Sequence, residues 1–266
     1  MTWLAIFFAI PFVTLFMTSL QQPIPGRSGR YTAGLEFGNY ATALTEYWPQ
    51  FLRSFVYAGI ATLLALAIAY PLAYFIAFKS GRWRSLLLIL VIAPSFASFL
   101  LRTYAWRTIL SDDGFVTTTL NSLHLLPDGR ILNTGLAVVA GLTYNFLPFM
   151  VLPLYAALER IDPRLIEAAG DLYASPFTTF RKVTWPLSMP GVVAGTLLTF
   201  IPAAGDYINA ELLGSTKDRM VGNVIQTNFI EFRDYPIASA LSFVLMAAIL
   251  VLVFSYIRRA GTEDLV

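Results

Sequence analysis

The side chains best suited to chemistry in this 266-residue chain lie where long apolar runs end. Asp206 follows the apolar run 189–205, and Tyr207 and Glu211 come shortly after it. The stretch from Pro190 to Asp206 corresponds to about 24 Å of helix, which places Asp206 at or just beyond the outer edge of a bilayer's hydrocarbon. A carboxylate at that depth is costly unless it is paired or wetted, so Asp206 is a candidate for binding a cation.

Asp206 also has a plainer interpretation, in which the helix end emerges into water and the carboxylate pairs with Arg102 or Arg107. Tyr104 and Trp106 in the same region could offer ring faces to a cation. The same residue types also serve as anchors at the membrane–water boundary. The candidate residues for a cation path are therefore Asp206, Tyr207, Glu211, Tyr104 and Trp106.

The composition is that of a membrane protein. Hydrophobic residues make up 57% of the chain and charged residues 13%, whereas about a quarter of a soluble domain is charged. The chain has no cysteine, which excludes disulfides and thiolate chemistry, and its formal net charge of +2 gives no strong indication of nucleic acid binding.

The sequence does not contain the residue patterns that several kinds of site require. Lys217 follows Gly214-Ser215-Thr216 without the spacing of a phosphate-binding loop, so no nucleotide site is expected in this chain. His124 is the only histidine and has no second histidine or cysteine with which to share a metal. No Ser/His/Asp set can be assembled, so we expect neither a metal, nor a cofactor, nor an enzyme acting alone.

Six apolar runs are long enough, at about 20 residues each, to cross a bilayer as helices. They lie near residues 3–20, 54–78, 85–101, 136–157, 189–205 and 236–257. The first run lacks a clear cleavage site, so we interpret it as a retained span. An amphipathic stretch through Leu44, Tyr47 and Trp48 is expected to lie in the plane of the interface.

Small residues and prolines predict how these spans pack. Alanine recurs at every fourth position through 61, 65, 69, 73 and 77, and Gly191 and Gly195 begin the fifth span. Such faces let helix backbones approach closely. Proline falls inside the second, third, fourth and fifth runs, and proline at membrane depth is tolerated where neighbouring helices or a wet cavity satisfy the freed backbone. The pattern favours helices arranged around a passage.

Lys and Arg predict the orientation. The loops 79–84, 158–188 and 258–266 carry nine basic residues in 46 positions, and the loops on the other side carry nine in 97. Because basic residues are enriched on the cytoplasmic side, both termini and the loop 158–188 are expected to be cytoplasmic.

The segment 162–190 is polar and carries its own helix signals. Asp162-Pro163 and Ser175-Pro176 each place an N-capping oxygen before a proline at the first helical position. We therefore predict two short helices, roughly 163–173 and 176–184, joined at a bend. A helical pair between two spans is suited to contact something outside the bilayer.

This segment resembles the coupling loop of ABC importer permeases, whose motif is Glu-Ala-Ala, three residues, Gly, nine residues and Ile-x-Leu-Pro. Here Glu167-Ala168-Ala169 opens the motif, and Val183, Trp185 and Pro186 stand at the Ile, Leu and Pro positions. Tyr173 occupies the place of the glycine, where the family uses a backbone conformation that other residues disfavour.

Other stretches are similar to the spermidine/putrescine branch of that family: 101–106, 147–153, 205–209, 211–214 and 233–236. The resemblance implies an all-α integral membrane protein with the type I importer fold: a first span and outer segment over 1–53, a five-span core over 54–257 and a cytoplasmic tail over 258–266. It also implies a second related permease, an ATPase dimer that binds ATP and Mg²⁺, and an extracytoplasmic binding protein, all in the bacterial inner membrane system.

On this resemblance, the residues implied to couple to the ATPase are Glu167, Ala168, Ala169, Leu172, Tyr173, Phe177, Phe180 and Pro186. A polyamine is the expected cargo, because carboxylates and aromatic faces suit a polycation. Arg53, Arg102 and Arg107 leave open an anion, a metal chelate or a thiamine-like cargo. A membrane anchor or sensor that recruits a partner without transport is a third hypothesis, which the proline-broken spans disfavour.

Overall fold

The computed structural model describes residues 2–24, 30–124, 126 and 129–260. Helices make up most of this described part of the chain. Its one sheet is a two-stranded antiparallel pair, β1 (Gln22–Pro23) and β2 (Tyr31–Thr32), in which Gln22 lies opposite Thr32. The predicted all-α class is therefore confirmed.

The helices fall into long rods and short connecting pieces. The long helices are α1 (Thr2–Ser19), α3 (Trp48–Phe78), α7 (Gly135–Glu159), α11 (Met189–Ala204) and α14 (Tyr235–Ala260). The shorter helices are α2 (Gly38–Glu46), α4 (Arg84–Ile92), α5 (Phe99–Ile109), α6 (Phe115–Ser122), α8 (Pro163–Asp171), α9 (Pro176–Thr179), α10 (Trp185–Leu187), α12 (Ile208–Leu213) and α13 (Val221–Ile230). Single turns complete the set: η1 (Gly81–Trp83), η2 (Ala93–Phe96), the π-helical η3 (Phe180–Thr184) and η4 (Thr216–Asp218).

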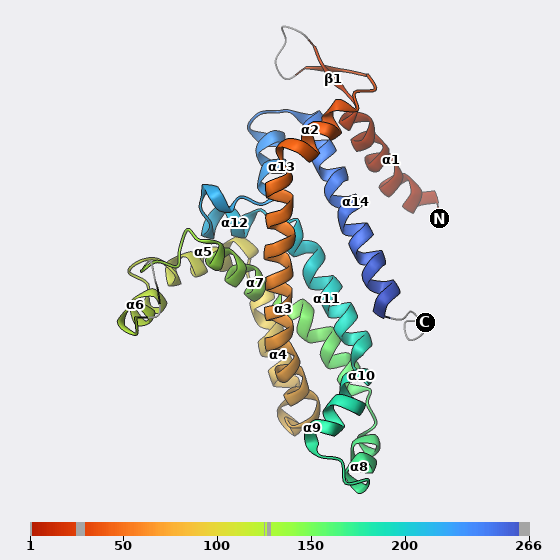
Figure 1. Ribbon diagram of the computed structural model, residues 1–266, viewed down its shortest axis with the longest axis vertical. Coiled ribbons are helices and arrows are strands. Elements are labelled where there is room, and N and C mark those ends of the chain that lie inside the picture. Colours follow the sequence, from red (N-terminus) through yellow and green to blue (C-terminus); the bar gives the residue numbers. More distant parts are fainter. Residues whose placement is uncertain (1, 25–29, 125, 127–128, 261–266) are drawn as a thin grey trace.

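Helices α3, α7 and α11 pack against one another at the centre of the molecule (Figure 1). The alanine face of α3 makes this contact, with Ala61, Ala65, Ala69 and Ala73 fully buried. An alanine face presents only methyl groups, so the partner helices approach closely. The predicted packing face is thus confirmed at these four positions, and Ala77 at its far end is half-buried.

The glycine at the start of α11 allows the closest approach to α7. A Cβ atom added at Gly191 would lie 2.6 Å from Ala157 Cβ and 2.7 Å from the Pro153 carbonyl oxygen. Part of this obstacle is backbone, which cannot rotate away. The small face predicted for the fifth span therefore packs as expected.

Gly191→Ala is accordingly expected to disrupt the α7–α11 contact and to lower the melting temperature of the purified protein by several degrees. Overpacking a tight helix contact typically costs about 1–3 kcal/mol. Gly59→Ala is the matched control, because nothing lies within 4 Å of a Cβ added at Gly59 on α3. Equal melting temperatures for the two variants would contradict this account of the contact.

The third apolar run, near 85–101, is a bent pair of helical segments rather than one straight helix, and the sequence did not predict this bend. Helix α4 continues through η2 and then breaks at Ala97 and Ser98, whose backbones are extended. The segments Gly81–Phe96 and Phe99–Ile109 meet at 95°. Pro94 sits in the 3-10 turn before the break, where a proline cannot donate a helical hydrogen bond.

Three described helices are long and apolar enough to cross a membrane: α3, α7 and the part of α14 over Tyr235–Arg258. Two bent pairs qualify when each is taken together, namely Gly81–Phe96 with Phe99–Ile109 and Pro176–Leu187 with Met189–Ala204, the second bent by 63°. Helix α1 adds a shorter apolar stretch over Ile6–Ser19. The described residues thus hold three to five candidate spans by length and composition.

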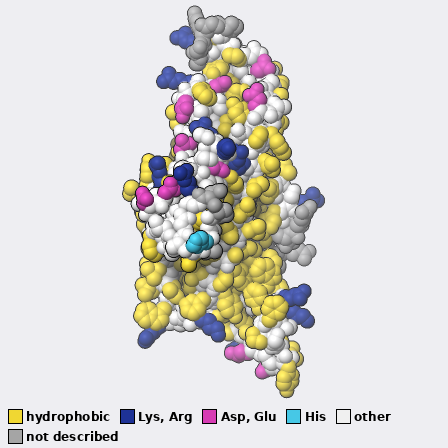
Figure 2. Space-filling model, turned by 60° about the vertical axis from the view of Figure 1, so that its left-hand side comes forward, with side chains coloured by type: hydrophobic (Ala, Val, Ile, Leu, Met, Phe, Trp, Pro, Cys, Tyr) yellow, Lys and Arg dark blue, Asp and Glu magenta, His cyan; other side chains and the backbone are white. Residues whose placement is uncertain are grey.

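The two ends of the molecule differ (Figure 1). The α8–α9 pair lies at one end, the β1–β2 hairpin lies at the other, and α5 and α6 project to one side. Figure 2 shows hydrophobic side chains over much of one face, with charged side chains toward the ends and on the projecting arm. The predicted boundary at 53/54 falls inside α3, and the predicted tail 258–266 lies outside the described residues from position 261 onward.

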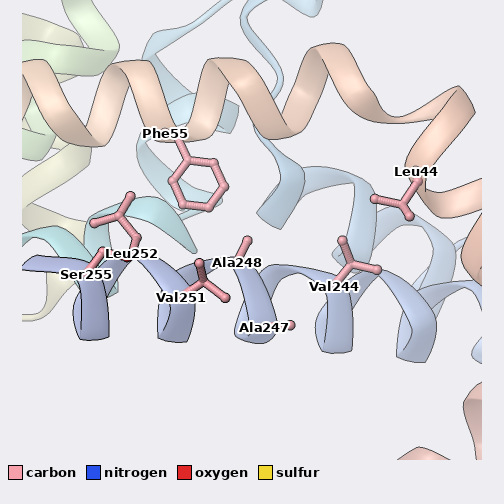
Figure 3. Close-up of a pocket in the computed structure, with 8 residues that line it drawn as sticks. All are labelled: Leu44, Phe55, Val244, Ala247, Ala248, Val251, Leu252 and Ser255. Atoms are coloured by element: carbon pink, nitrogen blue, oxygen red, sulfur yellow. The ribbon is translucent and has the colours of Figure 1, made fainter.

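An apolar groove of about 710 Å³ lies between α3 and α14. Figure 3 shows Phe55 pointing from α3 toward Ala248 and Leu252 of α14, while Val244 lies farther along α14 near Leu44. One hydroxyl is the only polar side chain in its lining, which consists of Leu44, Phe55, Val244, Ala247, Ala248, Val251, Leu252 and Ser255. Such a lining suits lipid chains or another helix and offers nothing to a charged ligand, so the site for a cation must lie elsewhere.

Candidate functional site

The break between α11 and α12 positions Asp206. Helix α11 ends at Ala204, and α12 begins at Ile208. The Asp206 carboxylate accepts hydrogen bonds from the backbone N–H of Asn209 at 2.8 Å and from Asn209 Nδ2 at 3.2 Å. Asp206 is 9% exposed, so a carboxylate is held largely buried at the end of an apolar helix.

The side-chain amide of Asn145 and the hydroxyl of Thr103 extend this hydrogen-bonded contact to two more helices. Asn145 Nδ2 in the middle of α7 donates to Asn209 Oδ1 at 3.0 Å and to Thr103 Oγ1 of α5 at 3.3 Å. We call the four side chains Thr103, Asn145, Asn209 and Asp206 the polar chain. Their hydrogen bonds join α5, α7 and the α11–α12 break within an otherwise apolar core.

The sequence predicted Asp206 as a site residue but not the other three members of the polar chain. An asparagine within the apolar run 136–157 was the available signal for Asn145, because a polar side chain at membrane depth is unusual. Thr103 and Asn209 gave no comparable signal, since both lie among mixed residues near predicted span ends.

Tyr207 and Glu211 lie next to the polar chain on the same short stretch. Asn223 Nδ2 of α13 donates to the Tyr207 carbonyl oxygen at 2.9 Å and to Glu211 Oε2 at 3.1 Å. Both side chains are exposed. The structure therefore brings Asp206, Tyr207 and Glu211 together and leaves Tyr207 and Glu211 accessible.

The two predicted aromatic residues of α5 have different surroundings. Helix α5 packs against α12, close to the polar chain. Trp106 is half-buried with its ring centroid 5.3 Å from that of Tyr144, which makes it a packing residue. Tyr104 is exposed and is the better candidate to offer a ring face.

The plainer interpretation of Asp206 is not found. The structure gives two ion pairs within its described part, Arg84–Glu159 and Arg130–Asp112, and neither includes Asp206. Arg53 is also occupied, because its Nη1 donates to the Arg219 carbonyl oxygen at 2.7 Å. Asp206 is therefore held by an amide rather than by a cation.

A second carboxylate, Asp218, fastens the loop after α12 to α3. Tyr57 of α3 donates its hydroxyl to Asp218 Oδ1 at 2.8 Å, and the Ser215 backbone N–H donates to Oδ2 at 3.0 Å. Burial alone would raise the pKa of Asp218, but the hydrogen bonds from Ser215 and Tyr57 and the charge of Arg53 outweigh it and hold that pKa below its ordinary value. Asp218 is thus a structural carboxylate.

At the opposite end of the molecule, the segment 162–190 forms the predicted pair of helices. Asp162 Oδ1 accepts from the Arg164 N–H at 2.9 Å, and Ser175 Oγ accepts from the Thr178 N–H at 3.3 Å, which confirms both N-caps. The first helix ends at Asp171, slightly earlier than predicted. The second continues beyond 184 through η3 and α10 to Leu187.

Tyr173 forms the bend between these helices with a φ of 58°, in the left-handed region that favours glycine. The bend therefore stays at the position of the expected glycine although a tyrosine stands there. Its neighbours supply the local hydrogen bonds: the Tyr173 N–H donates to Gly170 O at 2.9 Å, and the Ala174 N–H donates to Ala169 O at 3.0 Å.

Tyr173→Gly is expected to stabilise this bend. A left-handed backbone costs a non-glycine residue about 1–2 kcal/mol, while glycine loses more entropy on folding, about 0.5–1 kcal/mol. The net gain should slow amide hydrogen exchange at residues 171–175 about two- to fivefold. Tyr173→Val, with a β-branched side chain, should accelerate the same exchange, and the opposite order of the two variants would contradict the assigned strain.

The implied coupling residues divide into an exposed and a buried set. Leu172, Tyr173 and Phe177 are 82%, 99% and 71% exposed and form an apolar tip around the bend. Glu167, Ala168 and Pro186 are also exposed, and Ala169 is half-buried.

Phe180 differs from the other implied coupling residues, because its ring is half-buried against the spans. Its ring lies 5.6 Å from that of Tyr70 and 6.2 Å from that of Trp185, within the apolar cluster around α3 and α7. The reason is the continuation of the second helix into η3, which turns this ring toward α3. Phe180 therefore joins the helical pair to the spans.

Comparison with known proteins identifies this architecture. The family model described as "Binding-protein-dependent transport system inner membrane component" matches residues 1–260. The chain belongs to this family. Members of this family are membrane components of transporters, so the chain is a permease rather than an enzyme, as its sequence predicts.

Individual relatives of this inner membrane component share most of its length. The spermidine/putrescine transport system permease protein PotB of Haemophilus influenzae is 39% identical and is aligned over 97% of this chain and 90% of its own. PotB of Escherichia coli K12 is 37% identical over 97% of this chain and 94% of its own. The inner membrane ABC transporter permease protein YdcU of Escherichia coli is 34% identical over 80% and 72%.

Solved structures give the fold of the inner membrane component independently. A bacterial ABC transporter involved in the import of the acidic polysaccharide alginate matches with a TM-score of 0.74, covering 99% of this chain and 92% of that chain. The alginate transporter in complex with its alginate pentasaccharide-bound periplasmic protein matches with a TM-score of 0.75. At 18% and 19% identity, these matches establish the ABC importer permease fold and say nothing of cargo.

Proposed function

We propose that this inner membrane component forms the translocation path for a polyamine, spermidine or putrescine, in an ATP-driven importer. The observation that carries the proposal is the 37–39% identity to spermidine/putrescine permeases over 97% of the chain. The polar chain supports it, because a buried carboxylate among amides at a helix break is suited to a protonated amine.

The site residues have distinct proposed roles. Asp206 supplies the negative charge, and Tyr207 and Tyr104 offer exposed ring faces to the methylene and ammonium groups. Glu211 is the exposed carboxylate beside them and attracts the cation from the outer side. Trp106 holds α5 in place through its contact with Tyr144.

We further propose six membrane crossings, made by α1, α3, the bent α4–α5 segment, α7, α11 and α14. This arrangement places the α8–α9 pair and both termini in the cytoplasm, in agreement with the basic loops, and the β1–β2 hairpin outside. Broken helices at membrane depth commonly form the substrate sites of transporters. The breaks at Ala97–Ser98 and at Gly205–Tyr207 support such a site here.

The energy of ATP hydrolysis would reach the translocation path through the contact between this chain and the ATPase. The chain would pair with a second related permease. Two ATPase subunits, which bind ATP and Mg²⁺, would contact it on the cytoplasmic side. An extracytoplasmic binding protein would deliver the cargo from outside. The apolar tip of Leu172, Tyr173 and Phe177, with Glu167 beside it, would dock on the ATPase. Movement of the docked α8–α9 pair would then shift the membrane spans between two conformations.

The deciding experiment is uptake by the assembly reconstituted in vesicles. Delivery protein loaded with spermidine should stimulate ATP hydrolysis and carry labelled spermidine inward, and sulfate or thiamine should do neither. Stimulation by an anion or a chelate would support a different cargo. Binding of the ATPase without any uptake would instead support a membrane anchor.

A further inference from the structure

We infer that Asn145 recognises the cargo directly. Its Oδ1 accepts a hydrogen bond from a cargo ammonium, and its Nδ2 holds Asn209, and through it Asp206, in place. The inference deepens the proposed function and rests on it, since it names a recognition residue for the same cation. Neither the spacing of the motifs nor the relatives' names point to this residue.

The inference is carried by the side-chain amide of Asn145, in which the nitrogen is hydrogen-bonded and the oxygen is not. Asn145 is 1% exposed, and its Nδ2 is occupied by Thr103 and Asn209. Its Oδ1 is buried and has no hydrogen-bond partner within the described part of the chain. Buried side-chain acceptors are normally satisfied, and each exception calls for a physical explanation.

Neighbouring asparagines show what a purely structural role looks like. Asn209 Oδ1 accepts from Asn145, and Asn223 Oδ1 accepts from the Met220 N–H at 3.0 Å while its Nδ2 also donates. Asn223 is thus bonded at both ends of its amide. Asn145 is the member of this group whose carbonyl oxygen remains available.

The unpaired Oδ1 of Asn145 suits a ligand group that donates hydrogen bonds and accepts none. An ammonium group has three N–H donors and no lone pair. With Asn145 Oδ1 and the Asp206 carboxylate nearby in the polar chain, it would meet acceptors that complement it. An anionic cargo would meet two acceptor groups, the unpaired Asn145 Oδ1 and the Asp206 carboxylate. Both groups would therefore disfavour its binding.

The position of Asn145 indicates how an ammonium group would reach its Oδ1. Asn145 and Asp206 are both buried, with exposed fractions of 1% and 9%. Asn145 sits on α7, a continuous helix that contains Pro148 and Pro153 and ends at Glu159, shortly before α8 begins at Pro163. Motion of the α8–α9 pair would be passed along α7 to Asn145, and separation of α7 from α12 would admit the ammonium to Oδ1.

The test is equilibrium binding of labelled spermidine to the purified permease assembly in nanodiscs, with melting temperature and basal ATP hydrolysis measured alongside. Asn145→Leu removes the acceptor at similar volume and should weaken binding at least tenfold. Asn145→Asp keeps an acceptor oxygen and adds a negative charge but loses the Nδ2 donor to Asn209, so its spermidine binding should fall clearly less than that of Asn145→Leu. Asn228→Leu is the matched control, because Asn228 is buried but donates to Val224 of its own helix at 2.9 Å.

The outcomes separate the inference from the function beneath it. Spermidine binding that is unchanged by Asn145→Leu overturns the inference and leaves the polyamine function standing. Equal losses in Asn145→Leu and Asn145→Asp, accompanied by equal falls in melting temperature, show a structural bridge and also overturn it. No binding of spermidine, putrescine or another amine by the unaltered assembly overturns both.

Discussion

Changing Leu172 and Phe177 together to aspartate is expected to abolish energised uptake. The two side chains are 82% and 71% exposed and make few contacts within the chain, so the substitutions should leave folding intact. On the ATPase they would place two charges in an apolar contact, and burying an unpaired charge is strongly unfavourable. We expect co-purification of the ATPase to fall at least tenfold, measured on affinity-purified membranes.

Phe115→Asp is the matched control for this experiment. Phe115 is 82% exposed at the start of α6, on the arm that projects away from the α8–α9 end (Figure 1). Its change to aspartate should leave ATPase co-purification unaltered. Glu167→Lys, which reverses one exposed charge beside the tip, should reduce co-purification by a smaller factor. Retained ATPase binding in the double variant would refute docking through the tip.

Asp206→Asn is expected to lower polyamine uptake at least tenfold with little effect on assembly. The asparagine keeps the shape and the acceptor oxygen that binds the Asn209 N–H, so the α11–α12 break should persist. The charge is lost, and with it most of the attraction to an ammonium group. Initial rates of labelled spermidine uptake, divided by the amount of assembled complex, measure the effect.

Asp218→Asn should show the reverse pattern. Its carboxylate holds Ser215 and Tyr57 and lies on the loop that fastens α12 to α3. Removing charged hydrogen bonds typically costs about 1–3 kcal/mol, so the melting temperature should fall, while uptake per folded complex stays near that of the unaltered protein. If both aspartates affected uptake and stability alike, Asp206 would have no special role in the cargo path.

Local signals in the sequence predicted local structure well. The N-caps at Asp162 and Ser175 depend on neighbouring residues only, and both form as predicted. The alanine face of α3 follows from helical periodicity, and its burial follows because a face of methyl groups is where another helix can approach. Asp206 directly follows the end of α11, as the end of the apolar run 189–205 indicated.

Predictions that required the path of the chain in three dimensions did less well. Hydropathy records how apolar a run is and not its direction, so the 95° turn at Ala97–Ser98 was missed. The resemblance implied Phe180 as a residue that couples to the ATPase, and the structure adds that its ring, at the start of the π-helical turn η3, packs half-buried against Tyr70. A single π-helical turn leaves no mark in residue spacing.

The composition of the sequence indicates a helical membrane protein, and contacts between residues close in the chain predict the helical pair, with N-caps at Asp162 and Ser175. The permease assignment, without a nucleotide site of its own, came from the resemblance of that segment to the coupling loop of importer permeases. Which polar groups meet could be seen only in the three-dimensional structure. Thr103, Asn145 and Asn209 come from three separate helices, and their hydrogen bonds exist because α5, α7 and α12 converge around the end of α11.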